Sequence, residues 1–286
     1  MSGPVTGHGR IAARFARLRA EGRGALIPFL EAYDPDLATS AAILRGMPAA
    51  GADLIEVGVP FTDPAADGPV IQQAGQRALK AGGSLAGTLA MVGEFRQGDD
   101  ETPVVLMGYL NPILAYGAER FCQDAKRHGV DGFIVVDMPT EEVDELDSHI
   151  VSAGLDLIRL VAPTTSDARL PAVVGSAAGF IYYVAIAGIT GTRSAASEDL
   201  ARAIPRVRAH TGLPVAIGFG VRTPEQAAHA VQVADAAVVA SALIETMVAS
   251  LDGDGRARPD TAKQVLDQVR GLADAVRQAR VGVAAS

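Results

Sequence analysis

The stretch DLIEVGVPFTDPAADGP, residues 53–69, contains a buried strand and the loop that follows it. Its first five residues are apolar except for Asp53 and Glu56, and the remainder is rich in proline, glycine and aspartate. An apolar run that ends in such residues is typical of a strand that leads into a loop. Glu56 is unexpected there, because a buried carboxylate is costly unless it is paired or protonated.

The same arrangement recurs along the whole chain. Short apolar or β-branched runs predict strands, and longer segments rich in alanine, leucine and charged residues predict helices between them. The predicted strands are residues 24–30, 53–57, 103–109, 132–137, 156–162, 180–185, 214–219 and 236–241. The predicted helices are residues 36–50, 70–81, 118–128, 141–153, 167–174, 196–210, 224–231 and 242–249.

Most of the predicted strands are continuous apolar runs, which is typical of parallel strands covered on both faces. Eight strand–helix units in one chain predict an α/β fold, a (β/α)8 barrel of the TIM type, with an open doubly wound sheet as the alternative. A further helix, from Asp260 to about Arg280, is expected to pack on the barrel. No linker divides residues 1–286, so we predict a single domain, with residues 1–10 and 281–286 flexible.

The composition excludes several classes of protein. Hydrophobic residues make up 49% of the chain, enough for a sizeable core, and the net charge of −8 comes with no basic stripe. Nucleic acids and anionic membrane surfaces are therefore not expected partners. Cys122 is the single cysteine and cannot form an internal disulfide, and no residues around it are spaced like metal ligands. With neither a signal peptide nor an apolar run long enough to span a membrane, the sequence predicts a cytoplasmic protein.

Glu56 is the first candidate for catalysis, since it lies near the end of a strand, where barrel enzymes place their chemistry. If Ile55 and Val57 pack on the helices, Glu56 points into the barrel mouth. A partly desolvated carboxyl has a raised pKa and suits acid–base catalysis, and Asp67 on the next loop could remain ionised beside it. The alternatives are that Glu56 pairs with a buried Arg or Lys, and that Asp63 and Asp67 only form turns.

Three short segments predict a phosphate site. Gly188–Gly191 follow the sixth predicted strand, Gly218–Gly220 follow the seventh, and Ala240–Ser241 end the eighth and begin a helix. Glycine turns expose backbone N–H groups, a helix N-terminus favours anions, and loops after strands seven and eight often bind phosphate in this fold. The candidate residues are Gly191, Gly218, Gly220 and Ser241.

Two tyrosines are candidates for contact with a substrate. Tyr109 lies at the end of the third predicted strand, and Tyr182 lies in the sixth, where one of two neighbouring tyrosines must face inward. The alternative for each is ordinary packing in the core.

Together these residues resemble the family of tryptophan synthase α chains, over about residues 8–250. The strongest match is LIEVGVPFTDPAADGP, residues 54–69, which follows the family pattern closely. The supporting segments are LMGYLNPI (106–113), GVDGFIVVDMPTEE (129–142), APTT (162–165), FIYYVAIAGITGTR (180–193) and PVAIGFGVRTPEQ (214–226).

The resemblance implies a lyase that cleaves indole-3-glycerol phosphate into indole and glyceraldehyde 3-phosphate by a retro-aldol reaction. It implies no cofactor in this chain and a β-chain partner that carries pyridoxal phosphate. Glu56 matches the catalytic glutamate, Asp67 a second carboxylate that binds the indole N–H, and Tyr182 a tyrosine near the substrate glycerol. The residues that match the phosphate cradle are Gly191, Gly218, Gly220 and Ser241. The residues that match the β-chain interface are Pro60, Asp63 and Asn111.

The chain also departs from the family pattern. Residues 31–34 read Glu-Ala-Tyr-Asp, where Thr-Ala-Gly-Asp is common, and we expect Tyr33 to place its ring near the barrel mouth. Ala185 and Ala187 replace common hydroxyl residues. Ala240 replaces a glycine, and its methyl group is expected to crowd the phosphate.

Two other functions remain open at this point. One is a stand-alone lyase that releases free indole, and the other is a non-catalytic barrel that regulates a β chain. The presence of both Glu56 and Asp67 argues against the non-catalytic barrel, because a binding module needs neither carboxyl group.

Overall fold

The computed structural model describes residues 9–142, 144–185, 193–218 and 220–279. Its strands form one parallel sheet with the order β5-β4-β3-β2-β1-β9-β8-β7-β6. The strands are β1 (Ala25–Glu31), β2 (Ile55–Gly58), β3 (Val104–Gly108), β4 (Gly132–Val135), β5 (Asp156–Leu157), β6 (Arg159–Val161), β7 (Ile181–Val184), β8 (Val215–Gly218) and β9 (Ala236–Val239).

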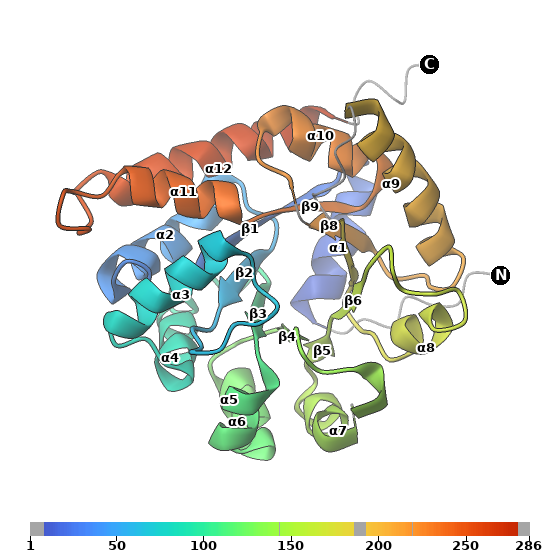
Figure 1. Cartoon of the computed structure of the whole chain (residues 1–286), viewed down its shortest axis with the longest axis horizontal. Coiled ribbons are helices and arrows are strands. Elements are labelled where there is room, and N and C mark those ends of the chain that lie inside the picture. Colours follow the sequence, from blue (N-terminus) through green and yellow to red (C-terminus); the bar gives the residue numbers. More distant parts are fainter. Residues whose placement is uncertain (1–8, 143, 186–192, 219, 280–286) are drawn as a thin grey trace.

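The two edges of this sheet are joined by the chain itself. Asp156 of β5 is in register with Gly132 of β4, whereas Arg159 of β6 is in register with Ile181 of β7. Ile158, between β5 and β6, donates its N–H to the carbonyl of Phe133 at 2.9 Å. The fifth predicted strand is thus two short strands that close the ring (Figure 1). The predicted (β/α)8 barrel is confirmed, and the open doubly wound sheet is wrong.

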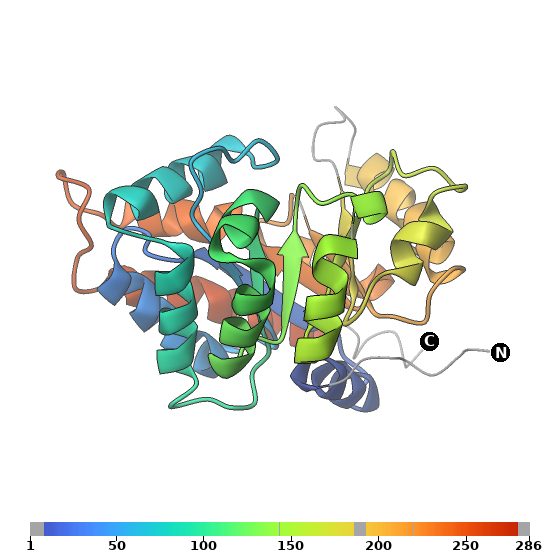
Figure 2. The ribbon, with the colours of Figure 1, turned by 90° about the horizontal axis from the view of Figure 1, so that it is seen from below.

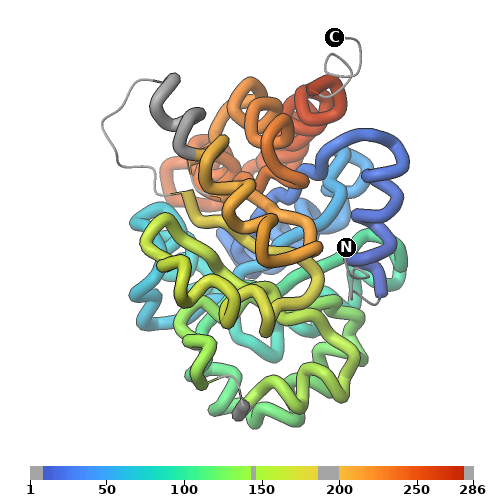
Figure 3. Tube along the Cα trace, turned by 90° about the vertical axis from the view of Figure 1, so that its right-hand side faces the viewer, coloured from blue at the N-terminus to red at the C-terminus, as the bar shows by residue number. Residues whose placement is uncertain are grey.

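Helices surround the barrel on all sides (Figures 1 and 3). Within the described ranges none of them combines the length and apolar composition that a membrane span needs. The helices are α1 (Arg10–Ala20), α2 (Leu37–Ala50), α3 (Pro69–Lys80), α4 (Leu85–Phe95), α5 (Leu110–Tyr116), α6 (Ala118–Arg127), η1 (a 3-10 turn, Thr140–Glu142), α7 (Asp144–Ala153), α8 (Leu170–Gly175), α9 (Arg193–Arg208), α10 (Pro224–Val233), α11 (Ser241–Ala249) and α12 (Thr261–Gln278).

The predicted C-terminal helix is present as α12, which packs against α2 and α10. The sequence did not predict α1, α4 or α5. Ile11, Phe15 and Leu18 of α1 are buried in the same apolar cluster as the inward residues of the strands. The ring of Phe15 lies 5.8 Å from that of Phe180. Helix α1 therefore plugs the end of the barrel opposite to the loop between β2 and α3 (Figure 2).

Two apolar layers show which way each strand residue points. The inner layer, inside the barrel, contains Ile27 of β1 and Leu54, which immediately precedes β2. The outer layer, between strands and helices, contains Leu26, Ile55 and Val57. Because side chains alternate along a strand, the residues at 29 and 31 of β1 and at 56 and 58 of β2 face the interior. This alternation places two glutamates, one on each strand, inside the barrel.

Candidate active site

Glu56 lies inside the barrel, as the sequence predicts. Its neighbours in register are Phe29 of β1 and Val105 of β3, and only 2% of the residue is exposed. Its Oε1 atom has no hydrogen-bond partner, and no Arg or Lys within the described ranges forms an ion pair with it. The alternative in which Glu56 pairs with a buried base therefore has no support among these residues.

The environment of Glu56 prepares it for proton transfer. Burial raises the pKa of Glu56 to about 8, and the negative charge of nearby Asp67 adds to the shift. A carboxyl group with such a pKa exists in both protonation states near neutral pH, so it can donate one proton and accept another. Burial and the charge of Glu56 also raise the pKa of the Tyr182 hydroxyl, which keeps this phenol neutral.

Tyr182 and Gly218 form a pair across neighbouring strands. Tyr182 of β7 is in the inner apolar layer, and its hydroxyl lies over Gly218 of β8. A Cβ atom at Gly218 would lie 2.0 Å from the Tyr182 Oη atom, a distance that no side chain could tolerate. Gly218 was predicted as a phosphate ligand, and the structure gives it the additional role of making room for Tyr182.

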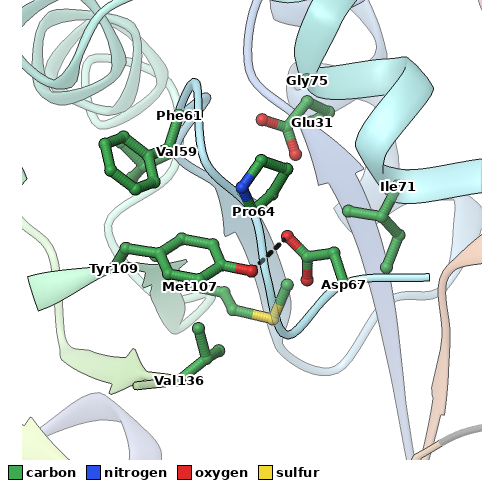
Figure 4. A pocket seen from close by; sticks show the side chains of 12 residues that line it. Glu31, Val59, Phe61, Pro64, Asp67, Ile71, Gly75, Met107, Tyr109 and Val136 are labelled. Atoms are coloured by element: carbon green, nitrogen blue, oxygen red, sulfur yellow. Dashed lines mark hydrogen bonds between the residues drawn. The ribbon is translucent and has the colours of Figure 1, made fainter. Parts of the chain in front are cut away.

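Asp67 lies on the loop between β2 and α3, where Tyr109 holds it. The Tyr109 hydroxyl donates a hydrogen bond to Oδ2 of Asp67 at 3.0 Å (Figure 4). It accepts a hydrogen bond from the N–H of Ala66 at 3.0 Å. Partial burial raises the pKa of Asp67, and the hydrogen bond from Tyr109 opposes this rise. Tyr109 is itself buried, but it also serves the site, because it fixes the orientation of a candidate catalytic carboxylate.

A cavity at the barrel mouth lies beside these two residues. Its walls are largely apolar, and the ring of Phe61 lies 5.3 Å from the ring of Tyr109. Asp67 and Tyr109 enter it from the two sides shown in Figure 4, so a carboxylate acceptor lies among apolar side chains at this place. The side chains of Glu31, Ile71, Met107 and Val136 also line this cavity. Glu56 lies deeper, one inward position before Gly58 on β2.

Glu31 was not predicted as a site residue. It belongs to residues 31–34, which depart from the family pattern. It ends β1, is 5% exposed, and lines the same cavity as Asp67. The signal that could have found it is the alternation of β1, in which residue 31 shares the inward face with residues 27 and 29.

The predicted phosphate residues are described in part. Gly191 and the rest of Gly188–Gly191 lie outside the described residues. Ser241 is the first residue of α11, and Gly220 follows β8 with φ +81°. Because β8 pairs with β9, the loop with Gly220 and the start of α11 leave neighbouring strands. Arg222, on that loop, forms an ion pair with Glu245 of α11 and ties the two segments together.

The predicted partner residues differ in exposure. Asp63 and Asn111 are exposed on the loop after β2 and at the start of α5. Pro60 is buried, and a Cβ atom at Gly83 would lie 3.0 Å from its Cγ atom. Pro60 can therefore shape this surface from below, whereas the other two residues are available for contact.

Tyr33 packs against the outer apolar layer at the start of α4. Its backbone has φ +70°, and its ring lies against α4, where Gly87 has no side chain. A Cβ atom at Gly87 would meet the Tyr33 hydroxyl at 2.3 Å. Tyr33 is not among the residues that line the cavity at the barrel mouth. Ala187 lies outside the described residues.

An inward acid whose pKa is raised to about 8, at the C-terminal end of a closed (β/α)8 barrel and with a second carboxylate at the adjoining cavity, is typical of an enzyme that transfers protons. Comparison with known proteins identifies which enzyme. The sequence profile of the tryptophan synthase α chain matches residues 15–277. The chain belongs to the tryptophan synthase α-chain family, and it is a carbon–carbon lyase of tryptophan biosynthesis.

Similar proteins cover almost the whole chain. The tryptophan synthase α chain of Gluconacetobacter diazotrophicus is 66% identical over 271 residues, which are 95% of this chain and 99% of that one. The α chain of Acidiphilium cryptum is 64% identical and covers 95% and 98%. The crystal structure of the α subunit from Legionella pneumophila superposes with a TM-score of 0.86, at 34% identity and coverage of 95% and 99%. A structure of tryptophan synthase from M. tuberculosis gives a TM-score of 0.82, at 33% identity and coverage of 94% and 99%.

Proposed function

We propose that Glu56 and Asp67 carry out the reaction of this lyase, the retro-aldol cleavage of indole-3-glycerol phosphate into indole and glyceraldehyde 3-phosphate. The observation that carries this proposal is Glu56 itself. It is an acid inside the barrel with a pKa of about 8 and no hydrogen bond to Oε1 in the described part of the chain. A carboxyl group of this kind is destabilising unless a ligand uses it.

In the proposed steps, Glu56 donates one proton and accepts another, so the protons balance over the cycle. Neutral Glu56 protonates C3 of the indole ring, which leaves a positive charge on the ring nitrogen that ionised Asp67 stabilises. The bond from C3 to the glycerol chain then breaks, and its electrons return to the ring. The hydroxyl group on the departing carbon loses its proton to the Glu56 carboxylate and becomes the aldehyde. Glu56 ends the cycle protonated, as it began.

We propose that the phosphate binds to backbone N–H groups near Gly191, Gly220 and Ser241. The N-terminus of α11 is the support for this, because no side chain caps it and a helix N-terminus favours a dianion. Arg222 is already paired with Glu245, so the cradle would not depend on that cation. Tyr182 would then lie between the phosphate and Glu56, close to the glycerol chain.

We also propose a β-chain partner, bound at the surface with Asp63 and Asn111. Both are exposed beside the cavity mouth, and one similar solved structure is named as tryptophan synthase as a whole. A single domain for residues 1–286 and a cytoplasmic location belong to the same proposal. The support for one domain is that every described strand belongs to one closed sheet.

The test is the release of indole from indole-3-glycerol phosphate, measured with and without an added β chain. Turnover that rises with the β chain supports the two-chain enzyme, and equal turnover in both conditions supports the stand-alone lyase. A chain that releases no indole in either condition, but activates the β chain, would support the non-catalytic barrel. The control is a preparation from the same host without this chain, because any indole that it releases comes from another enzyme.

A further inference from the structure

Glu31 occupies the place at which chemistry is expected in this fold, the inward end of a barrel strand. It is in register with Gly58 of β2, one inward position beyond the pairing of Phe29 with Glu56. Its carboxyl group lines the cavity that also contains Asp67 and Tyr109 (Figure 4). The mechanism above does not use this group.

Gly58 provides the space for this carboxyl group, and Gly75 lies beside it. A Cβ atom at Gly58 would lie 2.2 Å from Oε2 of Glu31, so any other residue there would displace the acid. A Cβ atom at Gly75 of α3 would lie 3.9 Å from Oε1, which is ordinary contact. Glu31 is therefore fitted against β2 on one side and α3 on the other, with its remaining side toward the cavity.

The charged groups around Glu31 are mostly of its own sign. Asp67 faces it across the cavity, and Asp34 lies on the loop after β1. Arg77 of α3 is the cation that acts on it, but two of its three guanidinium nitrogens, Nε and Nη2, donate to Asp34 at 2.7 and 2.8 Å. No residue in the described ranges donates a hydrogen bond to the Glu31 carboxyl group.

The other titratable groups at this end of the barrel add no positive charge. Glu56 lies one inward position deeper on β2, and the Tyr109 hydroxyl donates to Asp67. Burial, and after it the negative charge of Asp67, raise the pKa of Glu31 well above its usual range. Of Glu31, Glu56 and Asp67, Asp67 is the most exposed and the one with a hydrogen-bond donor, so it is the one best able to hold a charge.

We propose that Glu31 is a positioning residue for Asp67: it stays a neutral acid beside the cavity, and this neutrality leaves Asp67 as the single charged carboxylate that meets the ligand's N–H. The inference rests on the proposed function for the identity of that ligand. Ionised Glu31 would place a second negative charge beside the first, and Asp67 would then move away or take up a proton. Either change removes the acceptor for the indole N–H.

The first test follows the proton directly. The protein is labelled with ¹³C at the glutamate carboxyl carbons and titrated by NMR as wild type, as Glu31→Gln and as Glu56→Gln. The resonance that disappears in Glu31→Gln should titrate with a midpoint well above the usual 4.5. If that resonance titrates near 4.5, Glu31 is a carboxylate at neutral pH and the proposal is wrong.

The second test separates Glu31 from Glu56 by binding of indole, which requires no proton transfer. The chain has no tryptophan, so the fluorescence of indole reports its binding without background. In the wild type, affinity should fall by about fivefold or more as Glu31 ionises. Glu56→Gln should retain this dependence on pH, whereas Glu31→Gln should lose it. An unchanged dependence in Glu31→Gln would overturn the role assigned to Glu31.

A merely structural role gives a different result. If Glu31 only fills space, Glu31→Gln and the wild type should show the same pH profile, and Glu31→Ala should lower stability without a specific effect on kcat. We expect instead that Glu31→Ala lowers kcat by a factor about ten times larger than the factor by which KM changes. Glu31→Gln should keep most of the kcat that Glu31→Ala loses. Absence of lyase turnover in the wild type, with both titration results as expected, would refute the proposed reaction and leave the assignment of Glu31 intact.

Discussion

The hydroxyl group of Tyr109 donates a hydrogen bond to Asp67 at 3.0 Å, and it is anchored by the N–H of Ala66, the residue before Asp67. The phenol is thus held by the loop that it orients. Burial raises the pKa of the Tyr109 hydroxyl, so it remains a donor through the whole neutral range. Tyr109, at the end of β3, therefore fixes the orientation of the Asp67 carboxylate on the neighbouring loop.

Tyr109→Phe should lower lyase turnover about tenfold, because Asp67 loses the donor that holds its orientation and charge. The hydrogen bond lowers the pKa of Asp67, so its removal raises that pKa. The acid limb of kcat/KM, which reports ionised Asp67, should consequently move to higher pH. An acid limb that stays in place would show that Tyr109 acts only through packing.

Glu56→Gln should fold and lose lyase turnover by roughly 10²–10⁴-fold, because the amide cannot carry a proton. The variant should nevertheless have a higher free energy of unfolding than the wild type at alkaline pH. The pKa of Glu56 is raised from 4.5 to about 8, so the folded wild type binds more protons between these values and loses stability as pH rises through them. Urea unfolding should show the variant to be more stable than the wild type at pH above about 8 and nearly equal below about 4.5. A variant that retains a tenth of wild-type turnover would remove Glu56 from the mechanism.

Gly218→Ala should displace the ring of Tyr182, because the new Cβ atom would lie 2.0 Å from its hydroxyl oxygen. Overpacking of this kind typically costs about 1–3 kcal/mol, and we expect kcat/KM to fall about tenfold with it. Gly271→Ala is the matched control, since a Cβ atom at that position of α12 meets nothing within 4 Å. Thermal unfolding and steady-state kinetics of the two variants would test this, and equal behaviour would contradict it.

Asp156→Asn should stabilise the chain at alkaline pH. Asp156 lies at the end of the barrel opposite to the cavity, and its Oδ2 atom has no hydrogen-bond partner within the described residues. Burial and then the charge of Asp131 raise its pKa from 3.8 to about 7. The folded state therefore binds more protons than the unfolded state between these values, and stability falls as pH rises from about 4 to 7.

The amide removes this loss, so the variant should gain about 1–3 kcal/mol in unfolding free energy at pH above about 7 and little at pH about 4. Asp131→Asn is the control, because its effect on the free energy of unfolding should have the opposite sign. Asp131 forms ion pairs with Arg10 at 3.0 Å and Arg96 at 2.8 Å, so its neutralisation should destabilise the chain at neutral pH. The same gain for Asp156→Asn at both pH values would show that packing, and not charge, is responsible.

The barrel and the inward position of Glu56 could be predicted because they depend on patterns of period two and on position along a strand. Ile55 and Val57 are outward residues, so Glu56 must point inward, and the structure agrees. The break at Ile158 could not be predicted, since residues 156–162 have the pattern of one strand and the break arises where the ring closes. Helix α4 was missed because its sequence contains Gly87 and Gly93, which weaken the helical signal.

Sequence reasoning omitted, or placed only coarsely, the residues whose positions depend on distant contacts. Tyr33 turns outward because Gly83 and Gly87 of a separate segment leave room for its ring. Glu31 fits inside because Gly58 leaves room for its carboxyl group. In both cases the deciding feature is a missing Cβ atom elsewhere in the chain, which a local pattern does not reveal.

Ser241→Asp should weaken binding of the phosphorylated substrate, because it places a carboxylate at the N-terminus of α11, where we propose that the dianion binds. Arg222 cannot compensate, since it is already paired with Glu245. We expect KM for indole-3-glycerol phosphate to rise about tenfold or more, equivalent to roughly 1.4 kcal/mol or more, while affinity for free indole stays the same. Ser241→Asn is the matched control, because it has nearly the same shape without the charge.

Ala240→Gly tests the same cradle from the preceding residue. Ala240 packs against the cluster of Phe29, Ala74 and Ile244, so its methyl group has a structural contact as well as a position beside the proposed phosphate. If the methyl group crowds the anion, removing it should lower KM for the phosphorylated substrate and leave indole affinity unchanged. If KM stays constant in Ala240→Gly and also in Ser241→Asp, the anion binds elsewhere, and a crystal soaked in glycerol phosphate would show where.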